Sequence, residues 1–214
     1  MSAFGISTYK GTNKSINAHQ ISVHVGDLTA ITLIEGYDGL FAASELKKHF
    51  SNEILIGFKS KKNNTREDPF RAAEATIKKA LEHSKKRLKK AQEERGDNSG
   101  ASFLSLVAYK GIVFAMNCGS GQAICMTKNG RLIKIAKPHT TANNNEVERI
   151  VKEGGQFYQT TVNIPFRKDM HVTGPLRVYP EGLTVTRTLG KSLTKHKRVQ
   201  TVSGTIKEPK GVLS

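Results

Sequence analysis

Two β-branched segments joined by a tight turn constrain the fold more than any other feature of the sequence. Residues 21–25 and 28–34 are rich in valine, isoleucine and threonine and partly alternate, and Gly26-Asp27 lies between them. Glycine and aspartate tolerate the backbone angles of short turns, so this pattern predicts an antiparallel hairpin. The turn also accounts for Asp27 without a metal ion.

The second of these segments runs into an Asp38-Gly39 turn, after which a short helix is predicted over residues 42–50. The basic residues at 47–49 suit the C-terminus of that helix, because cations are favoured at the negative end of the helix dipole. A carboxylate at such a junction can bind a divalent metal ion. Metal-assisted phosphate chemistry needs several oxygen ligands, usually around two ions, and the rest of the sequence does not supply them.

A long basic helix is predicted to follow a basic, asparagine-containing loop at residues 59–65. Glu67 and Asp68 with Pro69 are typical of a helix start. One apolar stripe then recurs every three to four residues, and its members are Phe70, Ala73, Ile77, Leu81, Ser84, Leu88 and Ala91. Lysine and arginine cover the other faces, which favours core packing for the stripe. Residues 96–100 break the helix.

Four short strands and another helix are predicted in the second half of the chain. The expected strands are residues 103–109, 112–117, 122–127 and 132–135, with turns at 110–111 and 128–130. A helix at 146–153 ends at Gly154-Gly155, residues 156–175 are expected to be irregular, and 183–188 form a short strand or turn. This order of elements predicts an α+β fold with antiparallel sheets rather than a parallel array.

The length of 214 residues suits a single domain with a sizeable core. No apolar run approaches the ~20 residues of a membrane-spanning helix, and the first residues do not form a signal peptide. We therefore expect a cytoplasmic protein; a cytoskeletal or ciliary location is compatible with this, and a nuclear one is left open. In a reducing compartment, Cys118 and Cys125 are expected to be buried free thiols rather than a disulfide.

The net charge of +16 is concentrated in two regions. Residues 59–95 hold 13 basic and six acidic residues, and residues 187–214 hold seven basic and one acidic. Two basic surfaces predict an acidic partner, such as nucleic acid, a ribosome, an anionic membrane or the acidic tails of tubulin in a microtubule. The candidate contacts on the long helix are Lys78, Lys79, Lys85, Lys86, Arg87, Lys89 and Lys90. A solvated helix face and a basic segment at residues 191–214 are the alternative explanation.

Five motifs occur in an order that resembles the metal-dependent Ser/Thr protein phosphatases of type 2C. They are the turn at residues 37–39, the strand start at 99–102, the hairpin segment at 115–123, His139 with residues 146–155, and the motif at 182–190. The last reads Gly-Leu-Thr-Val-Thr-Arg-Thr-Leu-Gly and is similar to the family's Gly-Leu-Ala-Val-Ser-Arg-Ala-Leu-Gly. The resemblance implies one domain over residues 1–209: an α-β-β-α sandwich of antiparallel sheets flanked by helices, lacking the last strands.

The departures from the family pattern fall on its catalytic positions. The family's first metal-binding motif aligns with Ile16, Asn17 and Ala18, and its phosphate-binding arginine aligns with Asn13, beside Lys14. At the other such positions stand Leu40 and Phe41 after the Asp-Gly turn, Ser120 and Pro138 in place of two aspartates, and Lys191 in place of the aspartate that closes the last motif. The strands with the family's last two metal-binding aspartates are expected to be missing.

Of the metal ligands that the resemblance implies, only Asp38 and the carbonyl of Gly39 remain. In the family such ligands hold two metal ions that activate water for attack on phosphate. One carboxylate and one carbonyl leave Mg²⁺ almost fully hydrated and weakly held. No cofactor is therefore expected, and Mg or Mn would bind only if this residual site works. Leu40 and Phe41 are expected to plug the site. Alternatively, Asp38 caps the turn or the following helix.

The function favoured by these features is a catalytically inactive domain, a pseudophosphatase, that acts as a binding or structural protein on an acidic partner or larger assembly. Lys14 and Arg187 are further candidates for binding a phosphate or the partner; a structural salt bridge is the alternative role for Arg187. Because missing strands leave unpaired backbone edges, we also expect another chain, or the basic C-terminal segment, to cover an edge of the sheet.

Two alternatives stay open. One is an active Mg- or Mn-dependent Ser/Thr phosphatase with a rearranged site, in which Asp38 works with Asp27, Glu35 or Asp169. The other is a nucleic-acid- or ribosome-associated protein that uses the long basic helix to contact phosphates without reading sequence.

Overall fold

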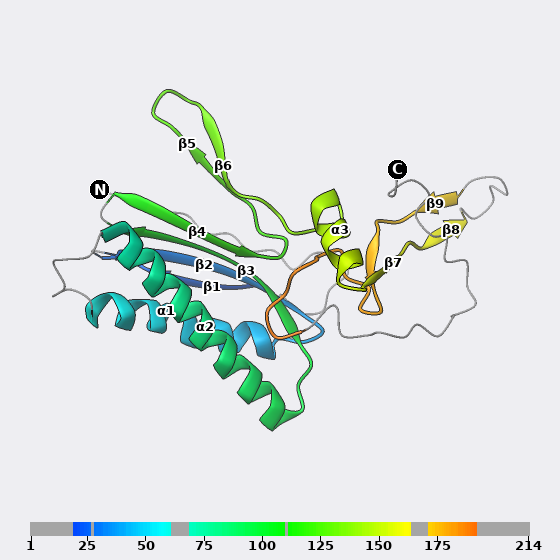
Figure 1. The fold of residues 1–214 in the computed structure, drawn as a ribbon, viewed down its shortest axis with the longest axis horizontal. Coiled ribbons are helices and arrows are strands. Elements are labelled where there is room, and N and C mark those ends of the chain that lie inside the picture. Colours follow the sequence, from blue (N-terminus) through cyan, green and yellow to red (C-terminus); the bar gives the residue numbers. More distant parts are fainter. Residues whose placement is uncertain (1–18, 27, 61–68, 110, 164–170, 192–214) are drawn as a thin grey trace.

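The computed structural model of the chain describes residues 19–26, 28–60, 69–109, 111–163 and 171–191. Two long helices lie on one face of a four-stranded antiparallel sheet, and smaller elements lie beyond its other face and at one end (Figure 1). The predicted α+β class with antiparallel sheets is therefore confirmed. The predictions for Lys14, Asp27, Asp169 and the segment 192–214 lie outside the described residues.

The central sheet has the order β1-β2-β3-β4, so strands that follow one another in the chain are neighbours in the sheet. Its strands are β1 (His19–His24), β2 (Leu28–Tyr37), β3 (Gly100–Tyr109) and β4 (Ile112–Cys118). The predicted hairpin is confirmed, with Ile21 opposite Leu33. β1 and β4 form the outer edges of the sheet, and no strand in the described part of the chain pairs with the outer side of either.

Helix α1 (Phe41–Ser60) is longer than the helix predicted over residues 42–50. The basic residues at 47–49 suggest an end, but apolar positions continue beyond them. Ile54 is fully buried, and the ring of Phe58 lies 4.8 Å from that of Tyr109 on β3. Packing of this second half on the sheet outweighs the local charge signal, because most helical stability in proteins comes from burying an apolar face.

Helix α2 (Pro69–Arg95) begins at the predicted proline and carries the predicted stripe into the core. Ala73, Ile77, Ser84 and Leu88 are all buried. The lysines between them are exposed, as the amphipathic pattern requires.

The main core lies between the two helices and the sheet. Phe50 of α1 meets Phe103 of β3 edge to face, with ring centroids 4.6 Å apart. Ile34, Leu46 and Val107 surround this pair and are at most 2% exposed. The sheet and both long helices are therefore held by one continuous apolar cluster.

The remaining elements form small two-stranded sheets around a third helix. They are β5 (Ala123–Met126), β6 (Leu132–Ala136), α3 (Asn144–Lys152), β7 (Gln156–Tyr158), β8 (Thr161–Asn163), β9 (His171–Thr173) and β10 (Arg177–Tyr179). β5 pairs with β6 as predicted, β7 with β10, and β8 with β9. The sequence predicts irregular backbone over residues 156–175, and this prediction is wrong at the described positions that form β7, β8 and β9. These strands have three residues each, too few for alternation to be recognised, and their pairing partners decide the outcome.

The two cysteines are free thiols, as predicted, but only one of them is shielded from water. Cys118 is half-buried and burial raises the pKa of its thiol. Cys125 lies on β5 and is exposed, so the prediction of a buried thiol is wrong at this position. None of the described helices combines the length and apolarity that a membrane span requires.

Phe103→Ala is expected to lower the free energy of unfolding by about 3–5 kcal/mol, because it leaves a cavity beside Phe50 at the centre of the core. The denaturation midpoint followed by far-UV circular dichroism measures this. Val113→Ala is the control, since Val113 is 56% exposed on the edge strand β4, and its cost should stay below about 1 kcal/mol. Equal losses for the two variants would contradict this placement of the core.

Candidate functional site around Asp38

Asp38 lies in the tight turn between β2 and α1. Its backbone φ is 54°, an uncommon value for a residue other than glycine, and Gly39 follows with φ 138°. A Cβ on Gly39 would lie 3.1 Å from the Cβ of Ser99, so the turn packs closely against the start of β3. This conformation explains why an Asp-Gly pair stands at the junction.

The N-terminus of α1 is capped by Ser99 and not by Asp38. The Ser99 hydroxyl accepts a hydrogen bond from the Ala42 amide at 2.9 Å and donates its own proton to Asp97 at 2.5 Å. The carboxylate of Asp38 contacts Lys191, so the interpretation of Asp38 as the cap of the turn or of this helix gains no support, and Ser99 binds the Ala42 amide instead.

The carboxylate of Asp38 is bound by Lys191. The Lys191 ammonium donates to Oδ2 of Asp38 at 2.5 Å and also contacts the carboxylate of Glu181. Burial by itself lowers the pKa of Lys191, but the hydrogen bonds to the two carboxylates outweigh it and raise that pKa above its ordinary value. The ammonium is therefore a lasting positive charge beside Asp38.

A short bridge between distant segments brings Lys191 to this position. Ala101 of β3 and Leu189 exchange two backbone hydrogen bonds, of 2.9 and 2.8 Å. A Cβ on Gly100 would lie only 2.9 Å from the Cβ of Lys191, so the absence of a side chain at Gly100 lets the two segments meet. The side chain of Lys191 is 15% exposed and that of Asp38 is 51% exposed.

The described residues around Asp38 do not supply the set of ligands that a divalent metal ion needs. A cation already lies against the carboxylate, where the charge of a second cation would be repelled. In the described part of the chain no three histidine, cysteine, aspartate or glutamate side chains converge in a way that could hold a metal ion. Leu40 and Phe41 follow the turn. Leu40 is half-buried, and Cζ of Arg95 lies 4.9 Å from the centroid of the Phe41 ring.

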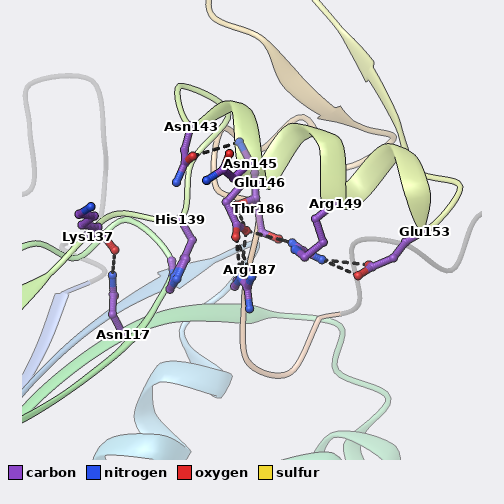
Figure 2. A network of polar contacts seen from close by, with 11 residues as sticks. Asn117, Lys137, His139, Asn143, Asn145, Glu146, Arg149, Glu153, Thr186 and Arg187 are labelled. Carbon is purple, nitrogen blue, oxygen red and sulfur yellow. Dashed lines mark hydrogen bonds and ion pairs between the residues drawn. The ribbon is translucent and has the colours of Figure 1, made fainter. Parts of the chain in front are cut away.

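Glu146 on α3 is the centre of a second charged network, which Figure 2 shows. Arg187 binds its carboxylate through two nitrogens, with Nε at 2.9 Å from Oε2 and Nη2 at 2.7 Å from Oε1. Thr186 donates to the same carboxylate at 2.8 Å, and Arg149 at 3.1 Å. Burial raises the pKa of Glu146, but these donors outweigh it and lower that pKa to about 2.

This network gives Arg187 a structural role, the alternative that the sequence offered for it. Arg149 extends the network to the Thr186 carbonyl at 2.8 Å and to Glu153, so α3 is tied to the segment that carries Lys191. His139 lies nearby, and its Nδ1 accepts from the Gly119 amide at 3.4 Å. Burial and then the charge of Arg187 lower the pKa of His139. Binding of a phosphate by Arg187 stays a prediction.

Glu35 lies on β2 among hydroxyl groups and does not join Asp38. Its Oε2 accepts hydrogen bonds from Tyr37 at 3.0 Å, Ser120 at 3.1 Å and Ser102 at 3.5 Å. Burial is the main reason that the pKa of Tyr37 rises to about 12, so its phenol keeps the proton that it donates. Of the partners considered for a rearranged site, Asp27 and Asp169 lie outside the described residues.

The basic residues of α2 are exposed but partly neutralised. Lys78, Lys85, Lys89 and Lys90 each have a glutamate one turn away within 4 Å. Arg87 contacts Glu53 and His49 of α1, and Lys79 and Lys86 are exposed. The helix has nine basic and four acidic residues, so a positive face remains. Their role as contacts stays a prediction.

Sequence reasoning missed two parts of this region. Glu181 has no motif of its own, and only the fold brings it to Lys191. The group of Glu35, Ser102 and Ser120 depends on the register in which β2 and β3 pair, with Glu35 opposite Ser102. The alternation of side chains along β2 and β3 could have suggested that these residues point to the same face of the sheet. It could not have shown that Glu35, Ser102 and Ser120 contact one another.

A model of the Protein phosphatase 2C family matches residues 10–210, nearly the whole chain, so the protein belongs to the protein phosphatase 2C family. No curated protein sequence matches the chain closely enough to count as a relative.

Solved structures agree with this fold assignment. A sex-determining protein from C. elegans matches with a TM-score of 0.68 and 15% identity, over 89% of this chain and 45% of that one. The serine-threonine phosphatase 2C from Toxoplasma gondii matches with a TM-score of 0.59 and 13% identity, over 85% and 70%. A PPM Ser-Thr phosphatase from Mycobacterium smegmatis matches with a TM-score of 0.50 and 14% identity, over 87% and 66%. At these identities the likeness concerns the fold alone.

Glu146→Gln is expected to cost about 2–3 kcal/mol of unfolding free energy at pH 7, because it weakens a buried carboxylate–guanidinium pair. The pKa of Glu146 falls from 4.5 to about 2 on folding, so its contribution is complete above pH 4.5 and is lost as the pH falls toward 2. Unfolding midpoints between pH 7 and pH 2 should therefore converge for the two proteins at the acid end. A constant difference across this range would contradict the assignment.

Proposed function

We propose that this chain is a catalytically inactive protein phosphatase 2C domain that works as a binding protein. The observation that carries the proposal is the ion pair of Asp38 with Lys191. The family chemistry needs a cluster of carboxylates around two metal ions. Here the remaining carboxylate is held by an ammonium group, which Glu181 also binds.

The binding surface that we propose is the exposed face of α2, directed at an acidic protein or assembly. The lysines on this face stand on a helix that the core fixes through Ile77 and Leu88, so their positions are defined before a partner arrives. The neighbouring glutamates reduce the positive electrostatic potential of this face without removing it. Such a surface suits a partner whose negative charges are separated from one another. Phe70 is the helix's one aromatic residue, so stacking of single-stranded bases has little support. Acidic tubulin tails in the cytoplasm fit this pattern better.

Phosphatase activity tests the first half of the proposal. Hydrolysis of p-nitrophenyl phosphate in millimolar Mn²⁺ is expected to proceed no faster with the wild-type protein than with Asp38→Ala. Turnover by the wild-type protein that disappears in this variant would show a working metal site and overturn the proposal.

Metal binding tests the role of the lysine separately. Lys191→Asp returns a carboxylate to the position beside Asp38, and it is expected to strengthen Mn²⁺ binding by about tenfold or more, measured by calorimetry. Lys191→Met is the matched variant, because it removes the ammonium without adding a ligand, and it should give a smaller gain. Tight Mn²⁺ binding by the wild-type protein would contradict the blocking role of Lys191.

Salt-dependent binding tests the second half. Replacing Lys85, Lys86, Lys89 and Lys90 by glutamate should lower the affinity for microtubules, measured by pelleting, by about tenfold or more at low salt. Added salt should likewise lower the affinity of the wild-type protein for microtubules. The matched control replaces Lys128, Arg131, Lys134 and Lys137, which are also exposed but lie in and beside the β5–β6 hairpin. Equal losses for both variants would show that net charge, and not the surface of α2, causes the binding. Stronger binding to RNA than to microtubules would favour a nucleic-acid partner.

A further inference from the structure

A pocket opens on the face of the central sheet that the two long helices do not cover. Its volume is about 260 Å³, and the side chains that matter here are His19, Ile21, Leu33, Glu35, Leu104 and Ser120. They come from β1, β2, β3 and the turn after β4. Because α1 and α2 cover the opposite face (Figure 1), this pocket is separate from the basic surface of α2.

The pocket has an apolar side and a charged end. Ile21 and Leu33 are opposite one another in the β1–β2 pair, and Leu33 is opposite Leu104 in the β2–β3 pair, so three aliphatic side chains lie in one row across the sheet. Two residues further along β2, and therefore on the same face of the sheet, Glu35 lies between His19 and Ser102 in the same way. A ligand that fits this surface has an alkyl stem and a positive head.

The hydrogen bonds that hold the carboxylate of Glu35 in place involve only one of its two oxygens. All three hydroxyl groups that bind it, those of Tyr37, Ser102 and Ser120, reach the same oxygen, Oε2. Its other oxygen, Oε1, lies 3.8 Å from Nε2 of His19. The side chain of Glu35 is 29% exposed and lines the pocket, and the hydrogen bonds to Oε2 hold its carboxylate in place.

We propose that this pocket binds the side chain of a lysine carried by a protein segment that lies along the face of the sheet left uncovered by the described helices. The four-carbon stem would cover Ile21, Leu33 and Leu104, and the ammonium would donate to Oε1 of Glu35. Lysine suits this site better than arginine, because a guanidinium binds a carboxylate through both oxygens and Oε2 already accepts three protons.

A protein segment is the occupant that the surroundings favour. Leu33 remains 44% exposed beside the pocket, and the adjoining β5–β6 hairpin exposes Ile124, Leu132 and Ile133. This hairpin is joined to the pocket through Gly121 and Gln122, which line it, and Ala123, which packs on Leu104. Apolar surface next to a fixed carboxylate matches a segment that alternates apolar residues with lysine, whereas a free amine would leave that surface uncovered.

The test compares three acetylated tripeptide amides, Val-Lys-Val, Val-norleucine-Val and Val-Arg-Val, by two-dimensional ¹H–¹⁵N NMR titration of the full chain at pH 7.5. The lysine peptide is expected to bind about three- to tenfold more tightly than the norleucine peptide, which has the stem but no charge. Its shifts should centre on the amides of Leu33, Glu35 and Gly121. The arginine peptide should bind more weakly than the lysine peptide.

Variants locate the effect on Glu35. Glu35→Gln should lower the affinity for the lysine peptide to that for the norleucine peptide. Glu148 is an exposed glutamate on α3, and Glu148→Gln should leave the affinity for the lysine peptide unchanged. The comparison of peptides on the wild-type protein needs no variant, so it remains decisive if Glu35→Gln fails to fold. Equal binding of the lysine and norleucine peptides would overturn the proposal, as would n-butylamine binding as tightly as the lysine peptide. Failure of the phosphatase or microtubule experiments would leave this result unaffected.

Discussion

The buried carboxylate of Glu146 joins α3 to the segment that carries Lys191, and the geometry around Asp38 depends on this connection. Arg187 and Thr186 both bind the carboxylate, and Leu189 then forms the bridge to Ala101. The order of these contacts along the chain fixes where residue 191 can lie. A buried carboxylate of this kind is costly unless every partner is present, and here Glu146 has donors on three residues.

The family scaffold and the family chemistry place different demands on the sequence. The scaffold needs close approaches of the backbone: a Cβ on Gly119 would lie 2.3 Å from the Cβ of Ser102, so this glycine cannot change without moving a strand. The site needs carboxylates held near one another, which repel when no metal is bound. Lys191 between Asp38 and Glu181 replaces that repulsion by attraction. The fold can therefore be kept while the chemistry changes, and function has to be argued from the site.

The sequence predicts those parts of the fold that local patterns determine. The β1–β2 hairpin follows from a turn between two β-branched segments, and α2 follows from an apolar stripe with a proline at its start. The end of α1 is mispredicted because basic residues suggest a helix end, while burial of Ile54 decides the matter. The resemblance to the family also implies that residue 191 belongs to the site of Asp38. It does not predict Glu181, or the meeting of Glu35 with Ser120, because contacts between residues 85 positions apart depend on the register of several strands.

The two regions proposed for binding lie on opposite faces of the central sheet. The helix face presents the lysines of α2, and the open face presents one carboxylate beside an apolar row. The layer between the two long helices and the sheet is filled by Phe50, Phe103 and their neighbours, so the helices cannot shift relative to the sheet. A rigid domain with a cation-rich face and a carboxylate pocket on opposite sides can hold two partners of opposite charge at a fixed distance. Such a role uses the stability of the phosphatase scaffold and requires none of its metal chemistry.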